Sequence, residues 1–177
     1  MNIIYARQTL PQRNARTEIL QNSIFLVGPT PRKDTITPSW RPEALRLLEE
    51  MRFSGTVFVP EDSDGSPQYD YDSQIWWEIE ALGRSAAIVC WLPRELRQMP
   101  AFTTNTEVGF TLALRPERCV FGFPPEAQKI KYQKALAQDI NRFRKAFGLP
   151  LLARADFPPC YETLSEALVA GVRRAAR

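Results

Sequence analysis

The sequence predicts a doubly wound α/β fold, in which a mostly parallel five-stranded sheet carries helices on both faces, of the flavodoxin or Rossmann kind. Strand and helix candidates alternate about five times along the chain. The strand candidates are continuous apolar runs rather than alternating ones, as expected when both faces of a parallel sheet are covered. A length of 177 residues suits one such domain, and 44% hydrophobic and 24% charged residues are typical of a folded globular chain.

Five strands are predicted from short apolar runs that end at turn residues. The first run ends at Gly28, the second at Pro60, and the third, which is the most apolar, at Pro93. The predicted ranges are 23–28, 56–59, 86–92, 119–123 and, for a short last strand, 151–153.

Five helices are predicted from apolar residues that recur three and four positions apart. Pro42 lies in the first turn of the first helix, with Ser39 as its candidate cap, and Asp72 is the candidate cap of the second helix. The predicted ranges are 41–51, 72–82, 103–114, 126–147 and 162–176. We interpret residues 1–22 as an irregular N-terminal arm and residues 23–177 as a single domain.

The expected ligand site follows from topology alone. With the common strand order 2-1-3-4-5, the first and third strands are neighbours at the point where the strand order reverses, and ligands bind in the crevice outside the carboxyl ends of these strands. The loops that follow Gly28 and Pro93, together with the loop 61–71 after the second strand, should therefore supply the functional residues.

The composition excludes several kinds of chemistry. The chain contains no histidine, which removes Ser-His-Asp and Cys-His nucleophile systems and the commonest metal ligand. Cys90, Cys119 and Cys160 are widely separated, and the first two lie in apolar runs, so we predict buried free thiols and no disulfide framework. We expect acid–base chemistry on carboxylates, tyrosines or lysines, without a metal or a cofactor.

The net charge of +3 is spread along the chain, mostly as arginine, and no basic run indicates a nucleic-acid polymer as partner. The longest apolar run, 86–92, is far shorter than the ~20 residues of a membrane helix. The first 16 residues contain no apolar core or cleavage site of a signal peptide. We therefore predict a soluble, cytoplasmic protein without a membrane partner.

Glu107 lies at the end of the third-strand loop and has two interpretations. Thr104 and Glu107 form the spacing of a capping box, in which the glutamate holds a backbone N–H at the start of a helix. Alternatively, Glu107 is a carboxylate that the helix dipole keeps ionised beside the crevice, suited to attack on an anomeric carbon. The spacing alone favours the cap.

Five segments of the chain resemble the nucleoside 2-deoxyribosyltransferase-like superfamily, in particular its compact bacterial and phage branch. They occur in the family's order and span about residues 23–114. The segments are FLVGPTPR (25–32), SWRPEAL (39–45), VFVPE (57–61), YDSQIWWE (71–78) and TTNTEVG (103–109).

The resemblance implies that Glu107 is a nucleophile that attacks C1′ of a nucleoside and forms a glycosyl-enzyme. The proton donor for the departing base would be Asp72 or Glu78, and at six residues apart only one of them should enter the site. Asn105 would hold the sugar hydroxyls or orient Glu107. Well-studied transferases carry an aspartate a few residues before the nucleophile, where this chain has Ala101 and Phe102.

Substrate-binding residues are expected in three places. Gly28, Pro29, Thr30 and Arg32 form the first-strand loop, where the family contacts sugar or phosphate, and Arg32 with Lys33 could hold a phosphate. Trp76 or Trp77 should line the crevice, with Trp77 as our choice, and Thr104 completes the set. The resemblance also implies a homodimer or higher homo-oligomer acting on a nucleoside or nucleotide. The alternative is a nucleotide-binding module of the same fold without turnover.

Overall fold

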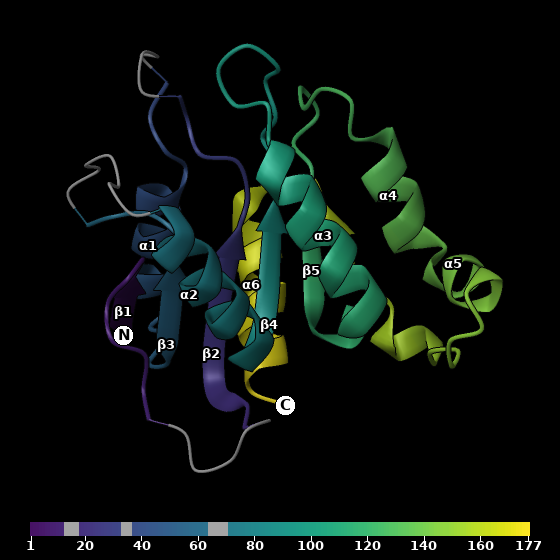
Figure 1. Cartoon of the computed structure of the whole chain (residues 1–177), viewed down its shortest axis with the longest axis horizontal. Coiled ribbons are helices and arrows are strands. Elements are labelled where there is room, and N and C mark those ends of the chain that lie inside the picture. Colours follow the sequence, from purple (N-terminus) through teal and green to yellow (C-terminus); the bar gives the residue numbers. More distant parts are fainter. Residues whose placement is uncertain (13–17, 33–36, 64–70) are drawn as a thin grey trace.

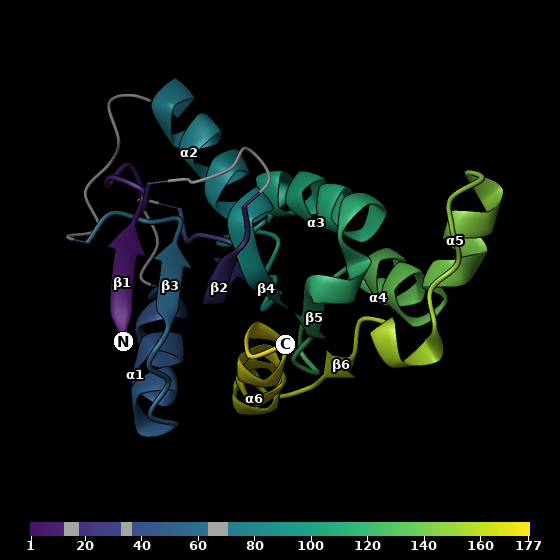
Figure 2. The same cartoon turned by 90° about the horizontal axis from the view of Figure 1, so that it is seen from below.

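A computed structural model describes residues 1–12, 18–32, 37–63 and 71–177 of the chain, apart from the side chain of Tyr71. It confirms the α/β class: one sheet of six strands, all parallel, carries helices on both faces (Figures 1 and 2). The strands are β1 (Asn2–Tyr5), β2 (Leu20–Val27), β3 (Thr56–Val59), β4 (Ser85–Trp91), β5 (Cys119–Gly122) and β6 (Cys160–Tyr161). Their order in the sheet is β1-β3-β2-β4-β5-β6.

The sixth strand comes from the segment predicted to be an irregular arm. Residues Asn2–Tyr5 form β1, which pairs in parallel with β3 at the edge of the sheet, with Ile3 opposite Val57. Ile4 is buried in the core. β1 contains only two aliphatic residues, Ile3 and Ile4, and lies at the edge of the sheet, which is why the sequence pattern did not reveal this strand. β2 also begins earlier than predicted, at Leu20.

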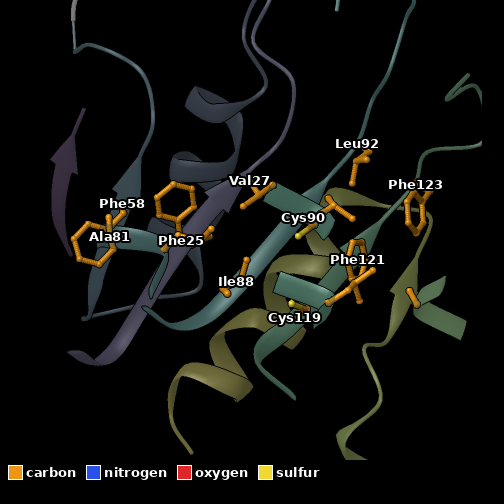
Figure 3. Packing of buried hydrophobic residues seen from close by; sticks show 14 of the residues in the cluster. Phe25, Val27, Phe58, Ala81, Ile88, Cys90, Leu92, Cys119, Phe121 and Phe123 are labelled. Atoms are coloured by element: carbon orange, nitrogen blue, oxygen red, sulfur yellow. The ribbon is translucent and has the colours of Figure 1, made fainter. Parts of the chain in front are cut away.

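The predicted strand order is otherwise found. Without β1, the order β3-β2-β4-β5-β6 is the expected 2-1-3-4-5. The continuous apolar runs also have the predicted cause, because alternate residues of β2 enter two different cores. Phe25 and Val27 belong to the core on one face, shown in Figure 3, and Ile24 and Leu26 to the core on the other.

The helices divide between these two cores. Buried residues of α1 (Arg41–Glu50) and α6 (Leu164–Ala175) belong to one core, and those of α2 (Tyr71–Arg84), α3 (Phe102–Leu114), α4 (Lys131–Gln138) and α5 (Ile140–Ala146) to the other. Figure 2 shows α1 and α6 below the sheet and α2 and α3 above it. Short 3₁₀ turns, η1 (Pro116–Arg118) and η2 (Arg154–Asp156), connect the later elements.

Two predictions for the last third of the chain are wrong. The single helix expected over 126–147 is two helices, which Asp139 separates with a non-helical backbone (φ −124°, ψ 47°). The short strand expected at 151–153 is absent: Leu151 is exposed, and the backbone of Leu152 bonds the side-chain amide of Asn141 instead of a strand. The last strand of the sheet is β6, where Cys160 lies opposite Phe121.

Candidate functional site

Glu78 of α2 and Glu107 of α3 lie on neighbouring helices on the same face of the sheet (Figures 1 and 2), and we call them the carboxylate pair because the charge of Glu78 acts on Glu107. Burial and, to a smaller extent, the negative charge of Glu78 raise the pKa of Glu107 to about 7, while Arg41 acts in the opposite direction. Burial also raises the pKa of Glu78, against the lowering effects of a 2.5 Å hydrogen bond from Gln74 and of the Arg41 charge. The pair therefore retains a proton close to neutral pH.

The capping-box interpretation of Glu107 is wrong, and the helix dipole does not keep this carboxyl ionised. α3 begins at Phe102, with Ala101 as its N-cap residue in the left-handed conformation (φ 60°), so Thr104 is the third residue of the helix and does not cap it. Glu107 lies in the second turn, where the helix dipole is weak. Burial and the nearby Glu78 dominate, so the carboxyl is held toward its protonated form instead of being kept ionised.

Arg41 supplies the fixed positive charge of the site. Its side chain is 1% exposed and lies beneath the loop after β2, where it donates to the carbonyl oxygens of Gly28 (2.7 Å) and Leu26 (3.3 Å) and to the hydroxyl of Thr30 (3.2 Å). It also forms an ion pair with Glu61 at 2.6 Å. These partners fix the guanidinium in place, so its charge acts on both carboxylates from a constant position.

No role was predicted for Arg41 or Glu61 from the sequence. The only signal for them was that they lie in two of the five segments that carry the family resemblance, SWRPEAL and VFVPE. Ser39, considered as a helix cap, accepts from the backbone N–H of Arg41 (3.2 Å) and donates to the Glu61 carboxylate at 2.8 and 2.9 Å. These contacts join the start of α1 to the end of β3.

The predicted binding loop after β2 is fixed by its own packing. A Cβ added to Gly28 would lie 2.3 Å from the Trp91 carbonyl oxygen and 2.6 Å from the ring of Trp40, so this position requires glycine. The Trp40 indole N–H donates to the carbonyl oxygen of Pro29 at 3.1 Å. The Arg32 side chain is exposed, and its backbone N–H bonds the Gln98 carbonyl oxygen at 3.0 Å. Lys33 lies outside the described residues.

Asn105 lies apart from the carboxylate pair. In an α-helix a residue two positions before Glu107 is turned by about 200° around the axis. The Asn105 side-chain oxygen accepts from Arg94 and from Gln133 (2.7 Å), and Arg94 also donates to the Lys129 carbonyl oxygen at 2.9 Å. Asn105 therefore joins the first turn of α3 to the loop after β4 and to α4, instead of orienting Glu107.

The remaining predicted residues have different surroundings from those expected. Asp72 is exposed and is the second residue of α2, so it is not the residue before the helix. Trp77 is buried, contacts the rings of Phe25 and Phe58, and donates its indole N–H to the carbonyl oxygen of Gln8 at 2.9 Å. It is a core residue instead of a surface for a base, whereas Trp76 is 69% exposed.

Cys90 and Cys119 are buried free thiols, as predicted, and Cys160 is a partly buried one. Within residues 1–12, 18–32, 37–63 and 71–177, no three cysteine, aspartate or glutamate side chains come together as a metal site would require. In the same part of the chain, no helix has the length and apolar character needed to cross a bilayer.

The carboxylate pair can perform one kind of chemistry with the groups present. One carboxyl can donate a proton while the other, ionised, acts as a nucleophile or base. Comparison of the chain with protein-family models gave no match, and comparison with curated proteins gave none either. These comparisons therefore assign no substrate class to the carboxylate pair.

Proposed function

We propose that this chain breaks the N-glycosidic bond of a (deoxy)nucleoside or nucleotide, by transfer or hydrolysis, with Glu107 as nucleophile and Glu78 as proton donor. The observation that carries the proposal is the pair of carboxylates on adjacent helices, each with a raised pKa. An oxocarbenium-like transition state needs an ionised carboxylate on one side of the sugar and a proton donor near the departing base. A pair that holds one proton near neutral pH supplies both groups.

The nucleoside character of the substrate rests on the resemblance of five segments to the deoxyribosyltransferase-like family. Three of these segments contain the carboxylates and the arginine of the site: Arg41, Glu78 and Glu107. Arg41 lowers the pKa of both carboxyls, which favours the ionised nucleophile once a substrate separates the roles of the two groups. Among the candidate donors, Glu78 is supported by its effect on Glu107, whereas Asp72 is exposed at the start of α2.

A nucleotide-binding module without turnover is the second candidate, and two observations favour it. With a pKa of about 7, Glu107 is largely protonated below neutral pH and would then donate a hydrogen bond to a ligand instead of attacking it. Ala101 also stands near the place where well-studied transferases carry an aspartate.

Release of free base separates the two functions. Purified protein is incubated with a panel of nucleosides and 5′-nucleotides, and free base is measured by chromatography. We expect turnover by the wild type, a loss of at least about a thousandfold in Glu107→Gln, which is roughly 4 kcal/mol of transition-state stabilisation, and normal turnover in Glu49→Gln, an exposed glutamate of α1. A 2-fluoro sugar analogue should add one glycosyl group to the wild type and none to Glu107→Gln. Ligand binding without base release in the wild type would select the binding module.

We also propose that the chain forms a homo-oligomer through the outer face of α2 and α3. α3 carries one charged residue, Glu107, in 13 positions, fewer than a helix that faces solvent normally carries. Yet large apolar side chains on these helices are exposed: Trp76, Ile79, Phe102, Phe110 and Leu114. An exposed apolar patch of this kind suits contact with its own copy, because apolar surface beside a two-fold axis meets its own equivalent.

Sedimentation and light scattering test the oligomer. We expect a dimer or larger species for the wild type and a 20.3 kDa monomer for Phe110→Asp, which places a carboxylate in the contact. Tyr132→Asp, at an exposed aromatic residue of α4, is the control and should stay oligomeric. A stable wild-type monomer at micromolar concentration would contradict this proposal while leaving the carboxylate pair untouched.

A further inference from the structure

A hollow of about 680 Å³ lies at the β6 edge of the sheet, on residues that the proposed function does not use. The segment that leads into β6, the end of α4 and the last turns of α6 enclose it. In Figure 2, α6 lies across the sheet from α2 and α3, which carry the carboxylate pair, and β6 is the edge strand beyond β5. The hollow and the carboxylate pair are therefore different places on the molecule.

Four arginines line this hollow, and none of its described lining residues is acidic. They are Arg154 of η2, Arg173 and Arg174 of α6, and Arg177. Among the described residues the one ion pair that any of the four makes is a long contact of 3.9 Å between Arg177 and Asp156. The positive charges of this group thus exceed the negative charge that the fold places beside them.

Packing accounts for one of the four arginines. Arg174 is 8% exposed and donates to the carbonyl oxygens of Glu117 and, at 2.9 Å, Phe157, so it holds the segment before β6 against the sheet. Burial lowers its pKa, and the nearby positive charge of Arg177 lowers it further, against smaller raising effects of Cys119, Asp156 and Glu117. An anion in the hollow would relieve this repulsion between like charges.

The helix dipole of α6 explains the position of some of the remaining arginines, but not of all of them. Cations in the last turn of a helix are favourable, which explains Arg173 and Arg174. Arg154 belongs to a separate turn, and its guanidinium lies over the Phe157 ring at 4.7 Å. Arg154 and Arg173 are both exposed, and neither has a carboxylate within 4 Å among the described residues.

We propose that this hollow binds an organic phosphate with two or more phosphate groups and a planar ring, the chemistry of a nucleoside di- or triphosphate. Guanidinium groups match phosphate oxygens with two parallel hydrogen bonds. Phe157, Pro158 and Pro159 form an apolar wall suited to a ring. The volume lies within the range of about 300–1,000 Å³ of small-molecule sites. The proposal is independent of the reaction at the carboxylate pair.

Cys160 offers a local measure of occupancy. It lines the hollow and is partly exposed, whereas Cys90 and Cys119 are completely buried. Burial raises the pKa of the Cys160 thiol to about 11, so neutral iodoacetamide at pH 9 should alkylate it slowly enough to follow by peptide mass spectrometry. A bound nucleotide should slow this alkylation at least fivefold, and a nucleotide bound at the carboxylate pair should leave it unchanged.

The experiment compares three probes on the full chain, by calorimetry and by Cys160 alkylation: a nucleoside triphosphate, inorganic pyrophosphate and the unphosphorylated nucleoside. We expect the triphosphate to bind and protect best, pyrophosphate to do so more weakly, and the nucleoside not to protect. The double variant Arg154→Ala/Arg173→Ala should weaken triphosphate binding at least tenfold, while Arg142→Ala, an exposed arginine of α5, keeps it.

Three results would overturn the proposal. The first is an absence of protection by the triphosphate at millimolar concentration and low salt. The second is equal protection in the wild type and the double variant, since the arginines would then play no part. The third is tighter binding of single-stranded RNA than of the triphosphate, which would make the hollow part of a polymer-binding surface.

Discussion

Replacing Glu107 by glutamine should make the protein more stable above neutral pH while removing its proposed activity. Its pKa is raised from an ordinary 4.5 to about 7 in the folded chain, so folding disfavours the charged carboxylate. Below about pH 4.5 the group is protonated in both the folded and the unfolded states and costs nothing. As the pH rises toward 7 the unfolded chain loses this proton first, and the folded state loses stability. Above about pH 7 the penalty is complete and constant.

The size of the penalty follows from the shift. Each pKa unit corresponds to about 1.4 kcal/mol, so a rise from 4.5 to about 7 gives roughly 3 kcal/mol at pH 8. Glutamine has nearly the same shape as glutamate and carries no charge. Glu107→Gln should therefore raise the free energy of unfolding at pH 8 by about 2–3 kcal/mol, allowing for the cost of burying an amide. For a domain of this size that corresponds to a rise in melting temperature of about 4–10 °C at pH 8, and to almost none at pH 4.5.

Urea unfolding at pH 4.5, 6, 7 and 8 measures this difference directly. Glu49→Gln, on the exposed face of α1, is the matched control and should follow the wild type at each pH. A Glu107→Gln variant less stable than the wild type at pH 8 would show that the charge of Glu107 does not destabilise the fold. A difference in stability of the same size at all four pH values would show the same.

Three further predictions follow from contacts around the site. Gly28→Ala should lower the free energy of unfolding, measured in urea, by about 2–3 kcal/mol, because its Cβ would lie 2.3 Å from a backbone oxygen. Gly109→Ala, which has open space around it, should raise the free energy of unfolding by up to about 1 kcal/mol, and equal effects of the two variants would show that Gly28 is not confined. Arg41→Met should lower the free energy of unfolding by about 3 kcal/mol, because it leaves the Glu61 carboxylate without its ion-pair partner. The double variant Arg41→Met/Glu61→Gln should lose less, since residue 61 then carries no charge, and additive losses would contradict this coupling. Base release should be unchanged after exhaustive chelation, and dependence on added Mg²⁺ or Zn²⁺ would contradict a mechanism that uses carboxylates alone.

The order of the main strands was predictable because their signals are local and redundant. β2, β3, β4 and β5 each bury residues on both faces, which forces a continuous apolar run that ends at Gly, Pro or a helix. β1 and β6 lie at the edges of the sheet and contain four and two residues, so their pairing depends on neighbours that the local sequence does not show. The break between α4 and α5 at Asp139 was hidden by apolar spacing that continues across it.

The candidate site was predictable in part, and for similar reasons. Glu78 and Glu107 were found as single residues, but their mutual effect depends on how α2 and α3 pack, which no spacing within one helix encodes. The buried position of Arg41 was not predictable, because an arginine in the first turn of a helix is normally exposed. Trp76 and Trp77 were correctly expected to face different surroundings, but Trp77, the residue chosen for the site, is the one in the core.

The roles of the two carboxyls can be separated by changing the pKa of Glu78 alone. Gln74 donates a 2.5 Å hydrogen bond to Glu78 that lowers this pKa, so Gln74→Met should raise it. If Glu78 is the proton donor, kcat/KM falls at high pH when the pair loses its last proton, and the variant should move that alkaline limb to higher pH. If Glu78 is instead the nucleophile, it must be ionised, and the acid limb would move to higher pH. Gln138→Met, at an exposed glutamine of α4, should move neither limb. Movement of the acid limb alone would therefore reverse the proposed assignment of Glu78 and Glu107, and an unchanged profile would remove Glu78 from the reaction.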